Sequence, residues 1–350
     1  MNSKDFLKRL IDAPGVTGYE EVASNEVLKA FEGYCDEVKV DDFYNVYGIK
    51  RGGNSKDRPK IMLAAHVDEI GLMVKDIDKD GFISFTNMGG VDQRILLSQE
   101  VIVYGKEPLF GVIGAKPPHL QKDGERDKAV KMEDMTIDLG LSVEKVKSLV
   151  SVGDVITFKS PLVAMQNGLV NGKSIDDRAG VVLLLEAMKE LDRMHFNADV
   201  YFVATVQEEV GTRGAIISTY GIDPDMGIAI DVTHGDTPDS PGEETFAMDK
   251  GPTIAIGPNL HPRLTQRLMD IAKEYKIDFQ IEVAPGPTGT DARSMQISRQ
   301  GVPTTLIGLP LRYMHTTVET LNMDCIKEAG RLIALFIASM EEGWEKWLSY

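Results

Sequence analysis

Four apolar runs constrain the fold of this 350-residue chain more than any other feature. They read IMLAAHV, DVYFVATV, GIAIDV and TTLIGL, and each is almost uninterrupted by charge. Strands buried on both faces have such runs, because neither face meets water. Helices are expected at about 178–194, 262–276 and 323–347, with Ser3 capping a first helix and a second beginning near Tyr19. The pattern predicts an α/β sheet covered by helices on both faces.

Residues 72–163 have a different texture. Short β-like segments (LMVKDI, FISFTN, EVIVYG, LFGVIGA and DVITF) are separated by Gly and Asp turns, and only one short helix is expected, near SVEKVKSLV. The charged stretch PPHLQKDGERDKAVKMEDM is expected to be an exposed loop. We infer a small β-rich domain at 72–163, inserted into a catalytic core formed by 1–71 and 164–350.

Composition excludes some classes of protein. The net charge of −16 argues against a nucleic-acid partner, because a phosphate backbone needs clustered Lys and Arg. The N-terminal segment lacks the apolar core of a signal peptide, and the longest apolar stretches are too short to span a bilayer. Cys35 and Cys325 lack CxxC spacing and are interpreted as buried thiols. A cytoplasmic location is expected, without membrane contact.

Five potential metal ligands lie beside a Gly, at a turn or at the end of an apolar run. They are His66, Asp176, Glu209, Asp231 and His315. Imidazole and carboxylate groups suit zinc, cobalt or manganese, and two His with three acids can hold two ions that share one carboxylate. The set therefore predicts a metal-dependent hydrolase.

Each of these residues also has a structural interpretation. A lone HxD is weak evidence, and Asp176 with Asp177 could simply cap a helix. Adjacent acids at a buried strand end, Glu208 and Glu209, are costly unless cations or a proton hold them. Asp68 is interpreted as the acceptor that fixes the ring tautomer of His66. The remaining candidates are interpreted as surface residues (His119, His195, His261) or loop residues (His234, Asp236).

Six motifs, in this order, resemble those of the M42 family of metallo-aminopeptidases, the glutamyl and deblocking aminopeptidases related to tetrahedral TET peptidases. They are AAHVDEIG, SIDDRAG, ATVQEEVGTRGA, AIDVTHGDTP, GPTGTDA and RYMHTTVE. The resemblance covers nearly the whole chain. It implies a mixed-sheet dinuclear metallopeptidase core and an inserted PDZ-like dimerisation domain. Subunits of this kind pair through the insertion and build a hollow tetrahedral dodecamer.

The resemblance also implies roles for individual residues. Asp176 would bridge two divalent ions (zinc or cobalt, with manganese as an option), one completed by His66 and Asp231 and the other by Glu209 and His315. Glu208 would be the general base, and Asp68, which is interpreted as orienting His66, is counted with it among the catalytic residues. The Asp176–Asp177 peptide bond would be cis, and Thr290 and Asp291 would lie beside the substrate pocket.

The expected activity is removal of N-terminal residues from peptides. A dinuclear carboxypeptidase or an amide deacylase remains an alternative, and so does a metal-stabilised assembly protein without turnover. Some relatives have a cellulase label, but a glycosidase needs two unligated carboxylates, and here the acids are assigned to metals.

Overall fold

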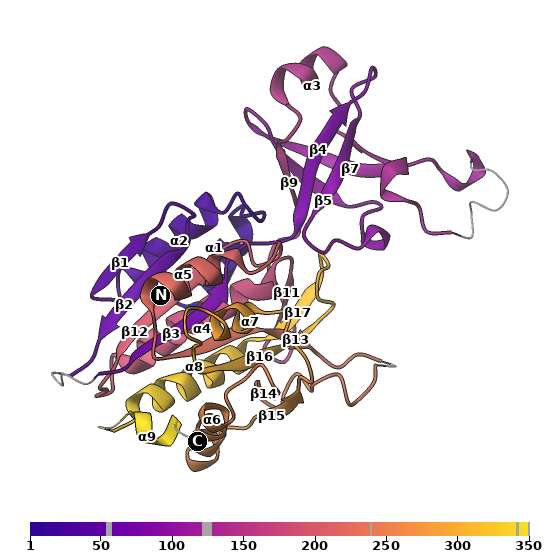
Figure 1. Ribbon diagram of the computed structural model, residues 1–350. Coiled ribbons are helices and arrows are strands. Elements are labelled where there is room, and N and C mark those ends of the chain that lie inside the picture. The colour runs from indigo at the N-terminus through magenta and orange to yellow at the C-terminus, as the bar shows by residue number, and fades with distance from the viewer. Residues whose placement is uncertain (54–57, 121–127, 239, 341–342, 349–350) are drawn as a thin grey trace.

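The computed structural model describes residues 1–53, 58–120, 128–238, 240–340 and 343–348. Its central feature is an 11-stranded mixed sheet (Figure 1). Nine strands form one path, in the order β1 (Glu37–Val40), β2 (Val46–Arg51), β12 (Asp199–Thr205), β3 (Lys60–His66), β13 (Met226–His234), β16 (Thr304–Arg312), β17 (Glu319–Asn322), β11 (Leu169–Gly172) and β10 (Val163–Ala164). Beside them, β14 (Thr253–Ile256) pairs with β16 and with β15 (Gln280–Val283).

The four predicted apolar runs form the middle of this sheet. Strand β3 pairs in parallel with β12 and β13, and β13 pairs in parallel with β16. Parallel strands end at the same edge of a sheet, so the polar residues that follow these runs are brought to one edge. That edge holds the candidate site.

Helices cover both faces of the sheet. One face is covered mainly by α1 (Ser3–Asp12), α2 (Glu21–Phe31), α4 (Ile175–Leu191), α6 (Pro262–Glu274) and α8 (Met323–Ala338). The short helices α5 (Arg213–Ile222) and α7 (Asp291–Gln296) pack on the other face. Within β3, Ile61 and Leu63 belong to the first core, whereas Met62 and Ala64 belong to the second. The prediction of burial on both faces is confirmed.

Several helix boundaries differ from the prediction. Asn2, not Ser3, caps α1, because the Asn2 side chain accepts a hydrogen bond from the Lys4 amide. The helix expected over 323–347 ends at Ala338, and a separate short helix, α9, spans Glu345–Leu348. Helices α5 and α7 were not predicted, and α7 follows the Gly-rich segment GPTGT, which is typical of a loop. None of the helices in the described part of the chain is long and apolar enough to cross a membrane.

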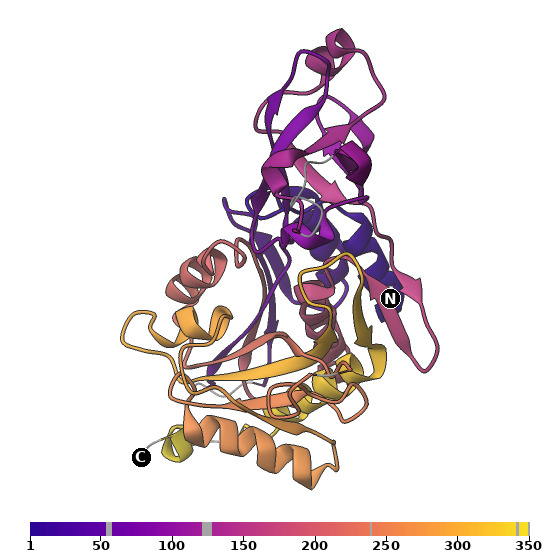
Figure 2. The same cartoon turned by 90° about the vertical axis from the view of Figure 1, so that its right-hand side faces the viewer.

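A small antiparallel β-barrel forms a separate domain. Its strands close in the order β4 (Gly71–Ile77), β5 (Ile83–Met88), β8 (Met135–Asp138), β7 (Pro108–Ala115), β6 (Glu100–Tyr104) and β9 (Val155–Phe158). It also has α3 (Val143–Leu149) and the 3₁₀ turns η1 (Gln93–Ile95), η2 (Pro118–Leu120) and η3 (Met132–Asp134). Its buried residues form their own cluster. Figures 1 and 2 show that the barrel stands apart from the core.

The five β-like segments and the short helix predicted for this region are present. Strand β8 was not predicted, because its first residue, Met135, closes the charged stretch expected to be a loop. Residues 121–127 of that stretch lie outside the described residues. The barrel strands begin at Gly71 and end at Phe158. Val163, the last residue of the insertion predicted at 72–163, instead pairs with Asn171 in the large sheet.

Candidate metal centre

The carboxyl edge of the central strands brings all five predicted ligands together. His66 is the last residue of β3, Asp231 lies within β13, and Glu209 and His315 lie in the loops after β12 and β16. Asp176 lies at the start of α4, where the backbone is not helical. The donor atoms of His66, Asp176 and Asp231 all lie within 4.8 Å of one another, as do those of Asp176, Glu209 and His315. Asp176 is therefore common to two potential metal sites.

The two oxygens of Asp176 face different histidines. Oδ1 is 3.2 Å from Nε2 of His66, and Oδ2 is 3.3 Å from Nε2 of His315. Nε2 of His315 is also 3.2 Å from Oε1 of Glu209. A carboxylate with one oxygen toward each group has the orientation that a bridging ligand needs. The Asp176–Asp177 peptide bond is cis, as the resemblance implies.

Both imidazole rings have a carbonyl acceptor on the side away from Asp176. Nδ1 of His66 is 3.2 Å from the backbone oxygen of Asp68, and Nδ1 of His315 is 3.1 Å from the backbone oxygen of Gly90. An Nδ1–H that donates to a carbonyl leaves Nε2 free to ligate. Gly90 belongs to the loop after β5, and a Cβ at this position would lie 2.7 Å from Nδ1 of His315. The barrel therefore contributes backbone to the site.

The carboxylate of Asp68 has a different main contact from the one predicted. It lies 3.5 Å from Nδ1 of His66, but it accepts hydrogen bonds from the amides of Glu208 at 3.0 Å and Glu209 at 3.2 Å. Glu20, a residue that the sequence did not single out, accepts from the amide of Gln207 at 3.1 Å. Two buried carboxylates thus hold three consecutive amides.

Buried acidic groups are crowded in the site, and their pKa values are shifted accordingly. Burial, opposed by His66 and reinforced by Asp231, raises the pKa of Glu208 to about 10. Burial also raises the pKa of Asp231 well above its usual value, with Asp177 adding to the effect. Hydrogen bonds to Asp176 and Glu209 raise the pKa of His315 to about 11. The ionised forms of these acids are opposed by burial and by one another, and they are favoured by His66 and, for Asp231, by the amide of Val232.

The residues present fit a pair of divalent cations. Two imidazole nitrogens and three carboxylates converge, and borderline metals such as zinc prefer this mixture of donors. Nearby cations favour the ionised form of a carboxylate, so they would offset the burial, and the repulsion by other acids, that raise the pKa of Glu208. Its Oε2 lies 4.0 Å from Nε2 of His66, close to the ligands but outside both groups of converging donors.

Glu319, to which the sequence pattern gave no role, connects the segment of Asp176 with the segment of His315. One of its oxygens accepts from the Asp176 amide at 3.1 Å and the other from the His315 amide at 2.9 Å. It is only 2% exposed. It lies within the motif RYMHTTVE, but no spacing rule predicts that its side chain turns back toward Asp176.

A second cluster consists of buried, paired charged residues that neighbour the candidate ligands in the sequence. Glu69, which is close in sequence to His66, forms ion pairs with Lys173 and with Arg178. These two cationic residues lie on either side of Asp176 in the sequence. The guanidinium of Arg178 also donates to the backbone oxygens of Ala13 and Val67. Charges buried in this way are tolerated because they are paired and hydrogen-bonded. The cluster fixes the segment that carries Asp176.

A pocket of about 740 Å³ opens beside the two ligand groups. Thr290 lines it, whereas Asp291 is only 2% exposed and accepts a hydrogen bond from Thr205 at 2.6 Å. His234, expected to be a loop residue, is the last residue of β13 and also lines the pocket. Asp236 is paired with Arg312 at 2.6 Å.

The other histidines lie outside this pocket lining. His119 and His195 are exposed, in agreement with the prediction. His261 is half-buried and caps α6, where its Nδ1 accepts from the Leu264 amide. The cysteines are free, Cys325 buried and Cys35 half-buried, and burial raises the pKa of both thiols to about 12.

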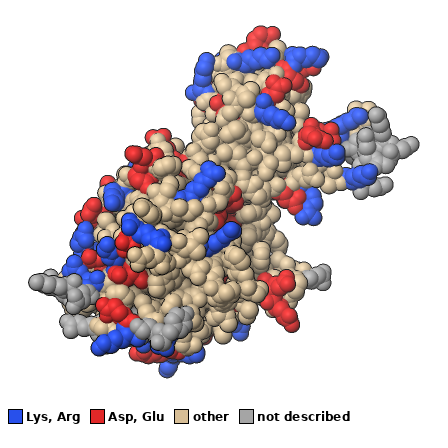
Figure 3. Space-filling model, viewed as in Figure 1, with Lys and Arg blue, Asp and Glu red and all other residues tan. Residues whose placement is uncertain are grey.

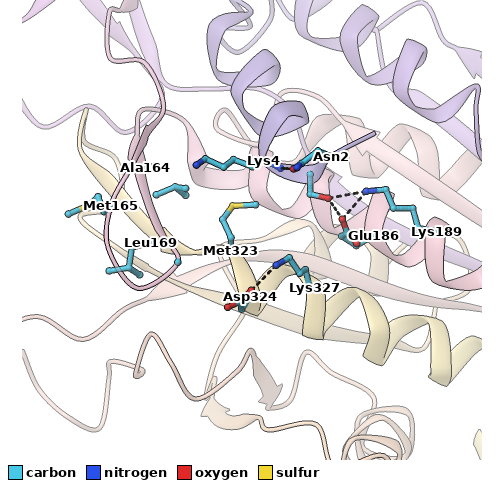
Figure 4. A pocket seen from close by; sticks show the side chains of 13 residues that line it. Asn2, Lys4, Ala164, Met165, Leu169, Glu186, Lys189, Met323, Asp324 and Lys327 are labelled. Carbon is cyan, nitrogen blue, oxygen red and sulfur yellow. Dashed lines mark hydrogen bonds and ion pairs between the residues drawn. The ribbon is translucent and has the colours of Figure 1, made fainter.

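A second cavity lies between α1, α4, α8 and the β10–β11 hairpin (Figure 4). Its charged side chains are largely paired with one another: Lys189 contacts Glu186 at 2.9 Å, and Lys327 contacts Asp324 at 2.8 Å.

On the molecular face shown in Figure 3, acidic and basic side chains are interspersed over both domains. The acidic groups at the sheet edge are therefore the leading candidate for a reaction centre.

Known proteins are similar to this chain over most of its length. The model of the M42 glutamyl aminopeptidase family matches residues 45–332. The lysyl aminopeptidase of Pyrococcus furiosus is 36% identical over 343 residues, which are 97% of this chain and 96% of the relative.

Solved structures are similar over the same extent. The TET aminopeptidase of the marine sediment archaeon Thaumarchaeota archaeon SCGC AB-539-E09 has a TM-score of 0.93 at 34% identity, covering 99% of each chain. The TET1 peptidase of Pyrococcus horikoshii, which can assemble into a tetrahedron or a large octahedral shell, has a TM-score of 0.85 at 32% identity, covering 97% of this chain and 100% of that one.

Proposed function

We propose that this chain, which belongs to the M42 glutamyl aminopeptidase family, uses a two-cation centre to remove N-terminal residues from peptides. The observation that carries the proposal is the position of Asp176, whose two oxygens face the two histidines of separate donor groups. One group would be completed by His66 and Asp231, and the other by Glu209 and His315. Zinc or cobalt would occupy both, with manganese as an option.

The cations would supply a Lewis acid for the scissile carbonyl and lower the pKa of the attacking water. Glu208 would accept a proton from that water and transfer it to the leaving amine. Its carboxylate is suitably placed, since it lies beside His66 but outside the two converging donor groups. The amides of Glu208 and Glu209 both donate to Asp68, which keeps the base and the adjacent ligand in a fixed relation.

The proposed assembly follows from the relatives. The P. horikoshii neighbour can assemble into a tetrahedron or a large octahedral shell, and this chain covers its whole length. We therefore propose that the barrel, predicted as an insertion at 72–163, mediates dimers with a PDZ-like role, and that dimers build a tetrahedral dodecamer. Peptides would be the other partners. The free thiols of Cys35 and Cys325 favour the proposed cytoplasmic location.

An assay with paired substrates tests the activity. Purified protein, stripped of metal and reloaded with zinc or cobalt, is given aminoacyl-p-nitroanilides with a free or an acetylated amine, and peptides with a blocked N-terminus. The proposed activity predicts release of p-nitroaniline from the substrates with a free amine. Release of C-terminal residues from blocked peptides would indicate a carboxypeptidase, and removal of the acetyl group a deacylase.

Two further outcomes would contradict the proposal. Absence of cleavage with every ion would favour an assembly protein without turnover. Release of sugar from cellulose, together with no release of p-nitroaniline, would favour a glycosidase.

A further inference from the structure

The pocket beside the metal centre contains a carboxylate that the proposed reaction does not use. Glu282 lies on β15, and its side chain lines the pocket. Its Oε2 accepts a hydrogen bond from Oγ1 of Thr253 at 2.7 Å, and Thr253 is fully buried. Because the hydroxyl comes from the sheet interior, it fixes where the carboxylate lies.

A glycine makes room for this carboxylate. Gly308 on β16 pairs with Asp231 on one side and with Thr253 on the other. A Cβ on Gly308 would lie 3.1 Å from Oε2 of Glu282 and would collide with Thr253. Directly paired residues of neighbouring strands project from the same face of a sheet. The carboxylate of Glu282 therefore lies over Gly308, on the face that also carries Asp231.

The charge of Glu282 is available for a ligand. Within the described residues, Glu282 forms no ion pair with an N···O distance of 4.0 Å or less. Arg293 lines the same pocket, but it is exposed, whereas Glu282 is half-buried. Water and salt screen an exposed charge more strongly than a partly buried one. The inner part of the pocket is therefore negative next to the sheet.

We propose that Glu282 selects peptides whose N-terminal residue is lysine or arginine, an inference that rests on the proposed aminopeptidase function. The strands of Asp231 and Gly308 are neighbours, about 4.8 Å apart. A residue bound with its scissile carbonyl beside Asp231 would extend its side chain over Gly308. The four-carbon stem of lysine is long enough to bring its ammonium to Glu282.

The chemistry of the pocket separates three classes of substrate. A basic side chain would form a charge-assisted hydrogen bond with a half-buried carboxylate. An acidic side chain would place a second negative charge beside Glu282, which disfavours binding. A leucine side chain would make neither contact, so it would be cleaved at an intermediate rate.

Kinetics on four p-nitroanilides test this selection. The metal-loaded wild-type protein should show the order Lys and Arg above Leu, and Leu above Glu, in kcat/KM. Glu282→Gln retains an oxygen that can accept from Thr253 but removes the charge. It should lower the ratio of kcat/KM for the lysyl over the leucyl substrate by roughly ten- to a hundred-fold, the usual effect of losing a hydrogen bond to a charged group.

A matched control removes the same charge elsewhere. Glu274 ends α6, is exposed, and belongs to a helix that packs on the other face of the sheet. Glu274→Gln should keep the wild-type ratio. If Glu282→Gln also keeps that ratio, or if the wild type prefers leucyl or glutamyl substrates, the selection by Glu282 is overturned. Failure of the wild type to cleave any of the four would instead overturn the proposed function.

Discussion

Glu20 and Asp68 hold the backbone segment that carries the proposed base. Their carboxylates accept hydrogen bonds from the amides of Gln207, Glu208 and Glu209. A base that must lie close to two cations without ligating them needs a fixed backbone, since a shift of one ångström changes the proton-transfer distance. These two acids therefore matter to catalysis through position.

At the scale of single residues, Glu208→Gln gives the clearest prediction. The amide is similar in shape but cannot take a proton from water, so kcat should fall about a hundred- to ten-thousand-fold. The variant should keep the wild-type metal content. Glu209→Gln is the matched control, because losing a ligand should lower the content of bound metal. Wild-type turnover in Glu208→Gln would remove this residue from the base role.

Glu20 predicts a pH-dependent stability. Burial, together with the charge of Asp68, raises the pKa of Glu20 from 4.5 to about 7. An acid with a raised pKa favours the folded state in its neutral form, so its contribution is full below pH 4.5 and is lost as pH rises through 7. Glu20→Gln stays neutral, and its oxygen can still accept from Gln207.

The measurement is thermal unfolding of metal-free protein at pH 5 and pH 8. Relative to wild type, Glu20→Gln should gain stability by about 3 kcal/mol at pH 8 and by much less at pH 5. Glu21→Gln, at an exposed neighbouring position, should follow the wild type at both. A gain of equal size at both pH values would refute the assigned titration.

At the scale of elements, the site depends on where parallel strands end. The alternation of Ile61, Met62, Leu63 and Ala64 between two cores places β3 in the middle of the sheet, and His66 then follows at its carboxyl edge. The central position of the strand and the place of His66 at its end could be predicted, because the apolar run ends in His. Asp231 shows the limit, because β13 continues for three residues beyond it and the apolar run alone does not reveal that.

Contacts between distant segments could not be predicted in the same way. Glu319 accepts a hydrogen bond from Asp176, and Glu20 accepts one from Gln207. These residues are far apart in the sequence, so hydrophobic periodicity within one segment cannot predict the contacts. Helix α7 was missed because its N-cap, Thr290, follows Gly-rich sequence that favours a loop. Glu282 was missed because a short edge strand with one acid resembles any surface strand.

The loop after β5 makes a further prediction, because Gly90 touches His315. A methyl group at Gly90 would lie 2.7 Å from Nδ1 and would displace the ring. Gly90→Ala should therefore weaken binding of one of the two cations by about ten- to a hundred-fold, an effect typical of altering a partner of a metal-ligating histidine. Stepwise metal titration of stripped protein measures it.

Gly114, also in the barrel, has open space where a Cβ would be, so Gly114→Ala is the control and should bind both cations as the wild type does. Unchanged binding of both cations to Gly90→Ala would show that this loop does not orient His315.

At the scale of the whole molecule, the barrel has two roles in the proposal. It contributes Gly90 to the site, and it is the proposed dimer contact. Sedimentation of the intact protein should show a particle of twelve times the subunit mass. Removal of the barrel, replaced by a short Gly-Ser linker, should yield smaller species, because the dimer contact is lost. A full-size particle without the barrel would assign assembly to the core.

The central claim is that Asp176 is shared by two cations, and an anomalous difference map from zinc-loaded crystals tests it most directly. Two peaks are expected in each subunit, one beside His66 and Asp231 and one beside Glu209 and His315, with a carboxylate oxygen of Asp176 against each. A single peak, or peaks away from Asp176, would contradict it.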